Sequence, residues 1–182
     1  MPAVPFPTNN ALIDGIANWA GNNVVKLVRL YSVKGGWEGW AQAELCMEIP
    51  LWPGLGGQCS REDTEVFTNH DRADLLHENP WTGKKIIELK CQSSGQDVAN
   101  IQGFATAYAI DAGKIQTGNR RAAHNTATDT WYVIGIAPSD SGDGGAVEAA
   151  KARFSQPNWA YRNSTHWTRR DQNSPWIFWT IY

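Results

Sequence analysis

Cysteine is scarce in the sequence, which contains only Cys46, Cys59 and Cys91. Their number is odd and their spacing matches no zinc pattern, so we expect neither a disulfide framework nor a zinc knuckle. At least two of them lie in apolar segments, which favours reduced thiols in a cytosol-like compartment. The histidines show no pairing at the helical i, i+4 spacing and are expected in loops or on the surface: His70, His77, His124 and His166.

Long apolar runs are missing as well. No segment reaches the roughly 18 uninterrupted apolar residues of a membrane span, and the N-terminal "MPAVPFPTNN" has no basic stretch followed by an apolar one. The sequence therefore predicts an intracellular protein, cytoplasmic or nuclear, without a membrane span. Its 182 residues, 42% of them hydrophobic and 19% charged, are enough for one ordinary domain with a buried core.

Two common catalytic motifs are absent. The glycine-rich "PGLGG" and "SDSGDGG" lack the lysine and the helix start of a phosphate-binding loop, so they are predicted to be simple loops. No nucleophile-elbow glycine pattern surrounds Cys91, Ser93 or Ser94. Nucleophilic catalysis by serine or cysteine is therefore not expected.

The charge of the chain is unevenly distributed. The formal net charge is −2, but residues 1–111 hold 8 Lys and Arg against 13 Asp and Glu, whereas residues 112–182 hold 8 against 5. Between Lys151 and Arg170 there is no acidic residue, and cations alternate with Trp159, Tyr161 and Trp167. Cations interleaved with flat aromatic rings suit phosphates and bases.

This pattern predicts a nucleic-acid-binding surface in the second part of the chain. The alternative is a basic surface over tryptophans that pack inside, because ten tryptophans in a small domain must mostly serve the core. The predicted nucleic-acid contacts are the cations Lys114, Arg120, Arg121, Lys151, Arg153, Arg162, Arg169 and Arg170.

Hydrophobic periodicity and turn residues predict a mixed β-sheet flanked by helices. The turn sequence "NPWTG" between two strand-like segments predicts a hairpin, and the continuous apolar run "WYVIGIAP" is typical of a strand covered on both faces. One or two short helices are expected within residues 11–32, and further helices over 37–50, 94–115 and 146–154. Strands are expected over 59–69, 71–78, 84–92, 131–138 and 175–182.

The strand-like stretch "KKIIELKCQ", residues 84–92, carries both an acid and a base in an otherwise apolar segment. Side chains alternate between the two faces of a strand, so Glu88 and Lys90 point to the same face. One interpretation is an ion pair on a solvated face. The hairpin offers another, because pairing residues 74–76 with 86–88 brings Asp74 near Glu88 and Lys90.

Glu44 is a second unusual acid. On a helical wheel for residues 37–50 it lies within the apolar stripe formed by Trp37, Trp40, Ala41 and Met47. An ionised carboxylate is costly to bury without a partner, so Glu44 either meets a cation or metal or lies at the rim of the packed face.

Two carboxylates on adjacent strands suit a hard divalent cation such as Mg²⁺ or Mn²⁺. Such an ion polarises a phosphoryl oxygen and lowers the pKa of bound water, and a nearby lysine orients that water or neutralises developing charge. The arrangement of Asp74, Glu88 and Lys90 therefore favours phosphodiester hydrolysis.

The order of these residues resembles the PD-(D/E)xK nuclease superfamily, with Asp74 in "RADLL", Glu88 and Lys90 in "IIELKCQ", and Glu44 as the candidate acid of the preceding helix. The resemblance covers roughly residues 36–138. It departs from the family pattern in that Ala73 precedes Asp74 where the motif has proline, and the following helix lacks the Gln-x-x-x-Tyr spacing of the RecB-like branch.

The resemblance implies a restriction-endonuclease-like α/β fold and an Mg²⁺- or Mn²⁺-dependent nuclease. It implies that Asp74, Glu88 and the carbonyl of Leu89 hold the metal, that Lys90 assists the attacking water, and that Gln92 contacts the water or the substrate. The expected organisation is one nuclease-like domain over residues 1–182, with its motif region at about 36–138 and an aromatic, basic part at 151–182.

DNA is the favoured substrate and RNA the alternative, and a homodimer would let two sites address two strands. Two other functions compete with the nuclease. One is a nuclease-fold module that no longer cuts and binds nucleic acid or protein. The other is a tryptophan-rich carbohydrate-binding module, in which the carboxylates on the strands would have no function.

Overall fold

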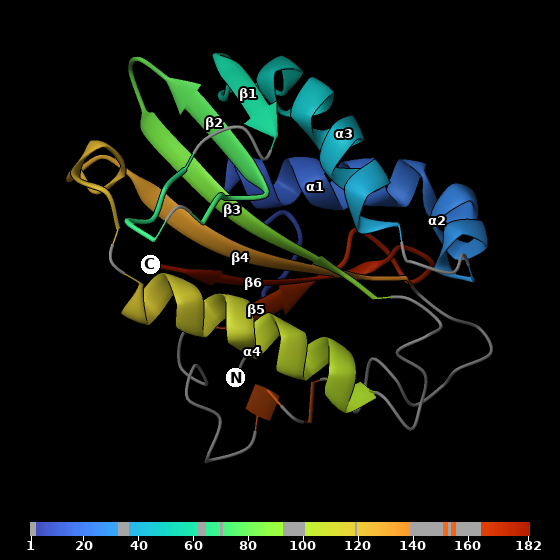
Figure 1. Cartoon of the computed structure of the whole chain (residues 1–182). Helices are drawn as coiled ribbons and strands as arrows, with labels where there is room; N and C mark the ends of the chain where they lie inside the picture. The colour runs from blue at the N-terminus through green and yellow to red at the C-terminus, as the bar shows by residue number, and fades with distance from the viewer. Residues whose placement is uncertain are drawn as a thin grey trace.

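The fold positions a set of charged side chains where one short strand ends beside a longer one, and Figure 1 shows the arrangement of its elements. The computed structural model describes residues 3–32, 37–61, 65–69, 71–92, 101–118, 120–138, 151–152, 154–155 and 165–182. The helices are α1 (Ala11–Asn22), α2 (Val24–Tyr31), α3 (Glu38–Glu48), α4 (Ile101–Thr117) and the 3₁₀ turns η1 (Ile49–Leu51) and η4 (Ala122–His124).

The strands form one mixed sheet in the order β1-β2-β3-β4-β6-β5. Strands β3 and β4 run parallel, and the other neighbouring pairs are antiparallel. The strands are β1 (Gln58–Arg61), β2 (Leu75–Asn79), β3 (Gly83–Cys91), β4 (Thr130–Ala137), β5 (Thr165–Thr168) and β6 (Trp176–Ile181).

Helices cover both faces of the sheet, with α4 on one face and α1 and α3 on the other (Figure 1). Strand alternation divides the core accordingly: Ile87 and Leu89 belong to the cluster under α1 and α3, and Ile86 belongs to the cluster under α4. Helix α4 lies close to β4 because Gly135 leaves room, since a Cβ there would lie 2.8 Å from Cζ of Phe104.

The predicted mixed α/β architecture is confirmed. The two short helices before residue 34, the helix that starts after Gly36 and the hairpin around "NPWTG" all occur. Strand β5 was not predicted, because it has only four residues and lies within the segment interpreted as a basic surface. Most of the helix expected over 146–154, and the start of the one expected at 94, lie outside the described residues. No helix found in the described ranges is long and apolar enough to cross a membrane.

Candidate functional site: a charged cluster at the end of the β2–β3 hairpin

Strand β2 is shorter than its neighbour β3, which leaves part of the β3 edge without a strand partner. The last pair of the ladder is Leu75 with Ile87, as the predicted hairpin required, and β3 continues to Cys91. Asp74 lies directly before β2 and therefore beside the start of this uncovered edge. The hairpin has brought Asp74 to Glu88, because the next pair of that register would join these two residues.

Two carboxylates occupy the uncovered edge. Asp74 Oδ2 accepts a hydrogen bond of 2.6 Å from Leu89 N, and Glu38 Oε2 accepts one of 3.0 Å from Cys91 N. In an extended strand the N–H and C=O of one residue point to the same side. The carbonyl of Leu89 therefore faces this same edge, past the last β2–β3 pair.

Glu88 points from β3 toward α4. Its side chain is buried, with the residue only 3% exposed, and Lys114 Nζ on α4 lies 3.0 Å from Glu88 Oε1. Lys114 also donates to the carbonyl of Arg72 and lies over the ring of Phe67, 5.2 Å from its centroid. One lysine of α4 thus serves as the counter-ion of Glu88.

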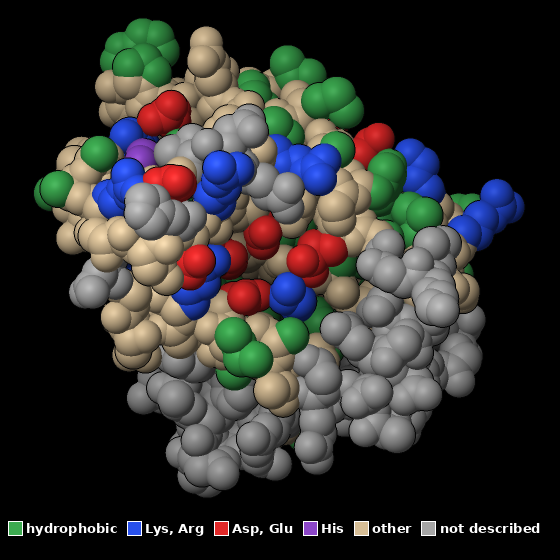
Figure 2. Space-filling view, viewed as in Figure 1, with side chains coloured by type: hydrophobic (Ala, Val, Ile, Leu, Met, Phe, Trp, Pro, Cys, Tyr) green, Lys and Arg blue, Asp and Glu red, His purple; other side chains and the backbone are tan. Residues whose placement is uncertain are grey.

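Lys90 is held by two other acids. Its Nζ lies 3.2 Å from Glu38 Oε1 at the start of α3 and 3.5 Å from Asp111 Oδ2 on α4. Asp111 and Lys114 are three residues apart, so they share one face of α4 and both reach the site. Figure 2 shows acidic and basic side chains gathered in a hollow above α4. We call this group the charged cluster: Glu38, Asp74, Glu88, Lys90, Asp111 and Lys114.

Crowding of carboxylates changes their protonation. Burial raises the pKa of Glu88 to about 8, and the neighbouring Asp74 adds to the shift while Lys114 opposes it. Burial also raises the pKa of Asp74 to about 6, against the hydrogen bond from Leu89 N. For Lys90, burial lowers the pKa, but Asp111 and Glu38 outweigh it, so the pKa is raised and the ammonium stays protonated.

The charged cluster is rich in oxygen atoms of the kind that a hard divalent cation takes as ligands. With all four carboxylates and both lysines ionised, its net charge would be −2. Within the described residues no group of three or more His, Cys, Asp or Glu is arranged to hold a metal. The predicted ligands, Asp74, Glu88 and the Leu89 carbonyl, would form a sparse oxygen set, with which Mg²⁺ would have to keep several of its waters.

Two further predicted site residues make contacts outside the charged cluster. Glu44 meets a cation, as one of its two alternatives required, because it pairs with Lys26 at 4.0 Å near the surface. Glu38, six residues earlier on α3, contributes the acid of that helix to the charged cluster. Gln92 is 2% exposed; its backbone N–H donates to Ile136 O, and its carbonyl accepts from Trp37 Nε1. Its side-chain oxygen has no hydrogen-bond partner among the described residues.

The predicted nucleic-acid contacts are spread over several places. Lys114 belongs to the charged cluster, Arg120 lies over the ring of Trp131, and Arg121 pairs with Glu65. Elsewhere, Lys151 and Arg169 both lie over the ring of Trp176, Arg170 donates to Asn22, and Arg153 and Arg162 are outside the described residues. Among the described contacts, none joins Arg169 or Arg170 to the charged cluster.

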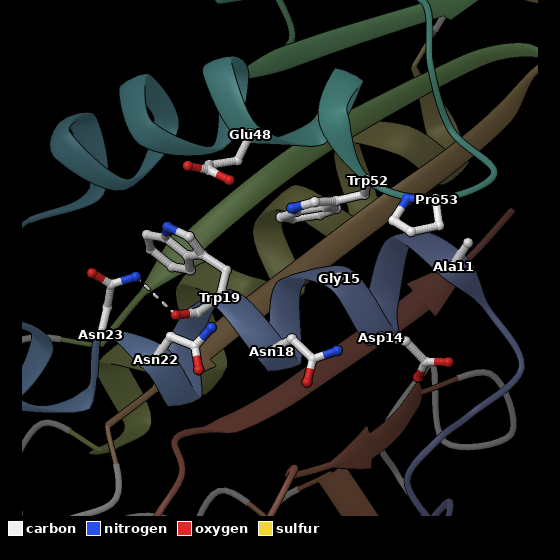
Figure 3. A pocket seen from close by; sticks show the side chains of 10 residues that line it. All are labelled: Ala11, Asp14, Gly15, Asn18, Trp19, Asn22, Asn23, Glu48, Trp52 and Pro53. Atoms are coloured by element: carbon white, nitrogen blue, oxygen red, sulfur yellow. Dashed lines mark hydrogen bonds between the residues drawn. The ribbon is translucent and has the colours of Figure 1, made fainter.

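A separate cavity of about 490 Å³ lies between α1 and the end of α3. Figure 3 shows its wall, with the indoles of Trp19 and Trp52 and the carboxylates of Asp14 and Glu48. The described residues that line it include no lysine, arginine or histidine. Carboxylates without cations repel phosphates, so this cavity does not suit a nucleic-acid backbone.

Asp111 and Glu38 are the functional candidates that the sequence analysis missed. Two signals were present: an acid in the first turn after "GGW" and an acid three residues before Lys114 on the helix. Comparison of the chain with protein-family models, with curated proteins and with solved structures found no match.

Proposed function

We propose that this protein is a metal-dependent nuclease of the PD-(D/E)xK type with a restriction-endonuclease-like fold, and that the charged cluster is its active site. The observation that carries the proposal is a pair of carboxylates, the half-buried Asp74 and the buried Glu88, from neighbouring chain segments beside Lys90. Burial raises the pKa values of both, and carboxyl groups with raised pKa values frequently lie at catalytic sites.

Asp74, Glu88 and the carbonyl of Leu89 would hold Mg²⁺ or Mn²⁺. When bound, the ion polarises a phosphoryl oxygen and lowers the pKa of a water molecule. It would also supply the two positive charges that the charged cluster lacks, which explains why so many acids are grouped where a polyanionic substrate must approach.

Lys90 provides a fixed positive charge at the reacting phosphate. Because its pKa is raised, it donates hydrogen bonds rather than accepting a proton, so it orients the attacking water or neutralises charge that develops on phosphate oxygens. Glu38 and Asp111 contact Lys90 from two different helices and act as positioning residues for its ammonium group. Lys114 is close enough to take part in binding the substrate phosphates.

The direct test is cleavage of labelled DNA and RNA, single- and double-stranded, with Mg²⁺, Mn²⁺ or EDTA. We expect cutting with either metal and none in EDTA, with DNA the preferred substrate. Sedimentation velocity on the same samples reports whether the active species is the monomer or the possible homodimer. A folded protein that binds nucleic acid but cuts none of these substrates would support the inactive nuclease-fold module instead.

Glu38 and Glu44 allow a matched comparison on one helix. We expect Glu38→Gln to lower kcat at least about tenfold with little change in KM, because Lys90 loses one of its two acids. Glu44→Gln, the same chemical change at a residue paired with Lys26, should leave both constants near the unmodified values. Steady-state kinetics on one oligonucleotide measures both variants; equal losses would contradict the assignment of Glu38.

A further inference from the structure

The tip of the β2–β3 hairpin presents a tryptophan to solvent on a well-held turn. Trp81 is 87% exposed. Its backbone N–H donates to the side-chain oxygen of Asn79 at 2.8 Å, that of Thr82 donates to the same oxygen at 3.1 Å, and Asn79 is anchored in turn on Leu55 O. Gly83 closes the turn with φ of 78°. The turn backbone is thus held by hydrogen bonds while a large indole side chain lies outside the core.

A groove of about 720 Å³ lies beside this indole, between the hairpin and the segment 123–129. Its walls combine one aromatic ring, one lysine, the carboxylates of Glu78 and Asp129, and several amides and hydroxyls that both donate and accept hydrogen bonds. The lining used in this argument consists of Trp81, Lys84, Gln58, Asn79, Thr126 and Thr128. An aromatic face with amides and hydroxyls around it is the chemistry that holds an unpaired nucleobase.

Cations connect the groove with the charged cluster. Lys114 lies over the Phe67 ring, and Arg121 donates a hydrogen bond to the carbonyl of Phe67. Helix η4 begins directly after Arg121, and the carbonyl of Ala123 in η4 accepts a hydrogen bond from Lys84 Nζ. Each of these cations already pairs with an acid: Lys114 with Glu88, Arg121 with Glu65 and Lys84 with Glu78. We call Lys114, Arg121 and Lys84 the cationic track. Figure 2 shows basic side chains between the hollow and the hairpin.

We propose, building on the nuclease function above, that the substrate strand follows the cationic track and stacks an unpaired base on Trp81. Strand β3 joins the two places directly, because Glu88 and Gly83 are five residues apart, about 17 Å at 3.4 Å per residue. The substrate is therefore a nucleic acid with single-stranded character next to the cleavage point, such as a single strand, an overhang or a frayed end.

The test is equilibrium binding by fluorescence anisotropy, in EDTA so that nothing is cut. The probes are a labelled single-stranded oligodeoxynucleotide and a blunt duplex of the same length. Loss of one stacked base weakens binding about 5- to 150-fold, so Trp81→Ala should weaken single-strand binding within that range and leave the blunt duplex nearly unchanged. Trp81→Phe, which keeps an aromatic face, should restore most of the affinity.

Leu51→Ala is the matched control, because Leu51 is 76% exposed and lies on η1, away from the hairpin. Unchanged single-strand binding by Trp81→Ala, or an equal loss on both probes, would overturn the stacking proposal while leaving the nuclease proposal standing. A change in sedimentation of Trp81→Ala without any effect on binding would assign Trp81 to self-association instead. Absence of binding by the unmodified protein to either probe would also overturn the stacking proposal, and the cleavage assay with metal would then decide the nuclease proposal separately.

Discussion

Replacing Glu88 by glutamine is expected to abolish metal-dependent cleavage and, at the same time, to make the metal-free protein more stable at alkaline pH. The loss of activity should be about a thousandfold or more, because several kcal/mol of transition-state stabilisation by the metal require this carboxylate, and each 1.36 kcal/mol is a factor of ten. The affinity for Mn²⁺, measured by isothermal titration calorimetry, and the rate of cleavage of one labelled substrate should fall together.

The gain in stability follows from the protonation of Glu88. Its pKa is near 4.5 in the unfolded chain and about 8 in the folded protein, so the folded state binds more protons between these values. Stability contributed by the protonated carboxyl is present below pH 4.5 and is lost as the pH rises toward 8. Glutamine fills the same space without ionising, and therefore removes this loss.

The measurement is the free energy of unfolding in urea between pH 6.5 and 8.5, in EDTA. Below this window Asp74 also titrates, and three histidines with pKa values lowered by burial act in the opposite direction: His77, His124 and His166. Across the window we expect the unmodified protein to lose about 2 kcal/mol and Glu88→Gln to lose much less.

Glu44→Gln is the control for this substitution. Glu44 lies on α3 and pairs with Lys26 at 4.0 Å, so its change is chemically the same but lies outside the charged cluster and the groove. It should leave cleavage and the pH dependence of stability unaltered. A Glu88→Gln variant that cuts normally would remove Glu88 from the active site, whatever its stability.

The part of the site that could be predicted from sequence is the part that local pairing determines. Alternation along 84–92 placed Glu88 and Lys90 on one face, and the turn "NPWTG" fixed the register that brings Asp74 to them. Both follow from backbone geometry within about 20 residues. The alternative interpretation, an ion pair between Glu88 and Lys90, does not occur among the described ion pairs. Lys90 pairs with Glu38 and Asp111 instead.

The choice between Glu38 and Glu44 could not be made in the same way. A helical wheel gives the direction of a side chain around the helix but not the height at which the helix meets a strand. The N-terminus of α3 meets the end of β3, as the hydrogen bond from Trp37 Nε1 to Gln92 O shows, so the first acid of the helix reaches the site. Only tertiary packing decides this.

Lys90→Ala is the other substitution for which we expect a large effect, a fall in cleavage of about 10²- to 10⁴-fold. That range is typical for a side chain that stabilises charge or guides a proton at the reacting atoms. The metal ligands Asp74 and Glu88 remain, so Mn²⁺ binding should persist or tighten, because the charged cluster becomes more negative by one charge. Loss of catalysis with retained metal binding separates the role of Lys90 from that of Glu88.

Stability of Lys90→Ala should change in the direction opposite to Glu88→Gln. Glu38 and Asp111 lose their shared cation, so the free energy of unfolding should fall at pH 8. It should recover as the pH is lowered and Asp74 and Asp111, whose pKa values are raised by burial, become protonated. Lys26→Ala, which removes a surface lysine paired with Glu44, is the control and should change neither cleavage nor stability appreciably. Mn²⁺ binding lost together with cleavage would instead make Lys90 a structural support of the metal ligands, because a cation that only orients water has no reason to strengthen the binding of another cation.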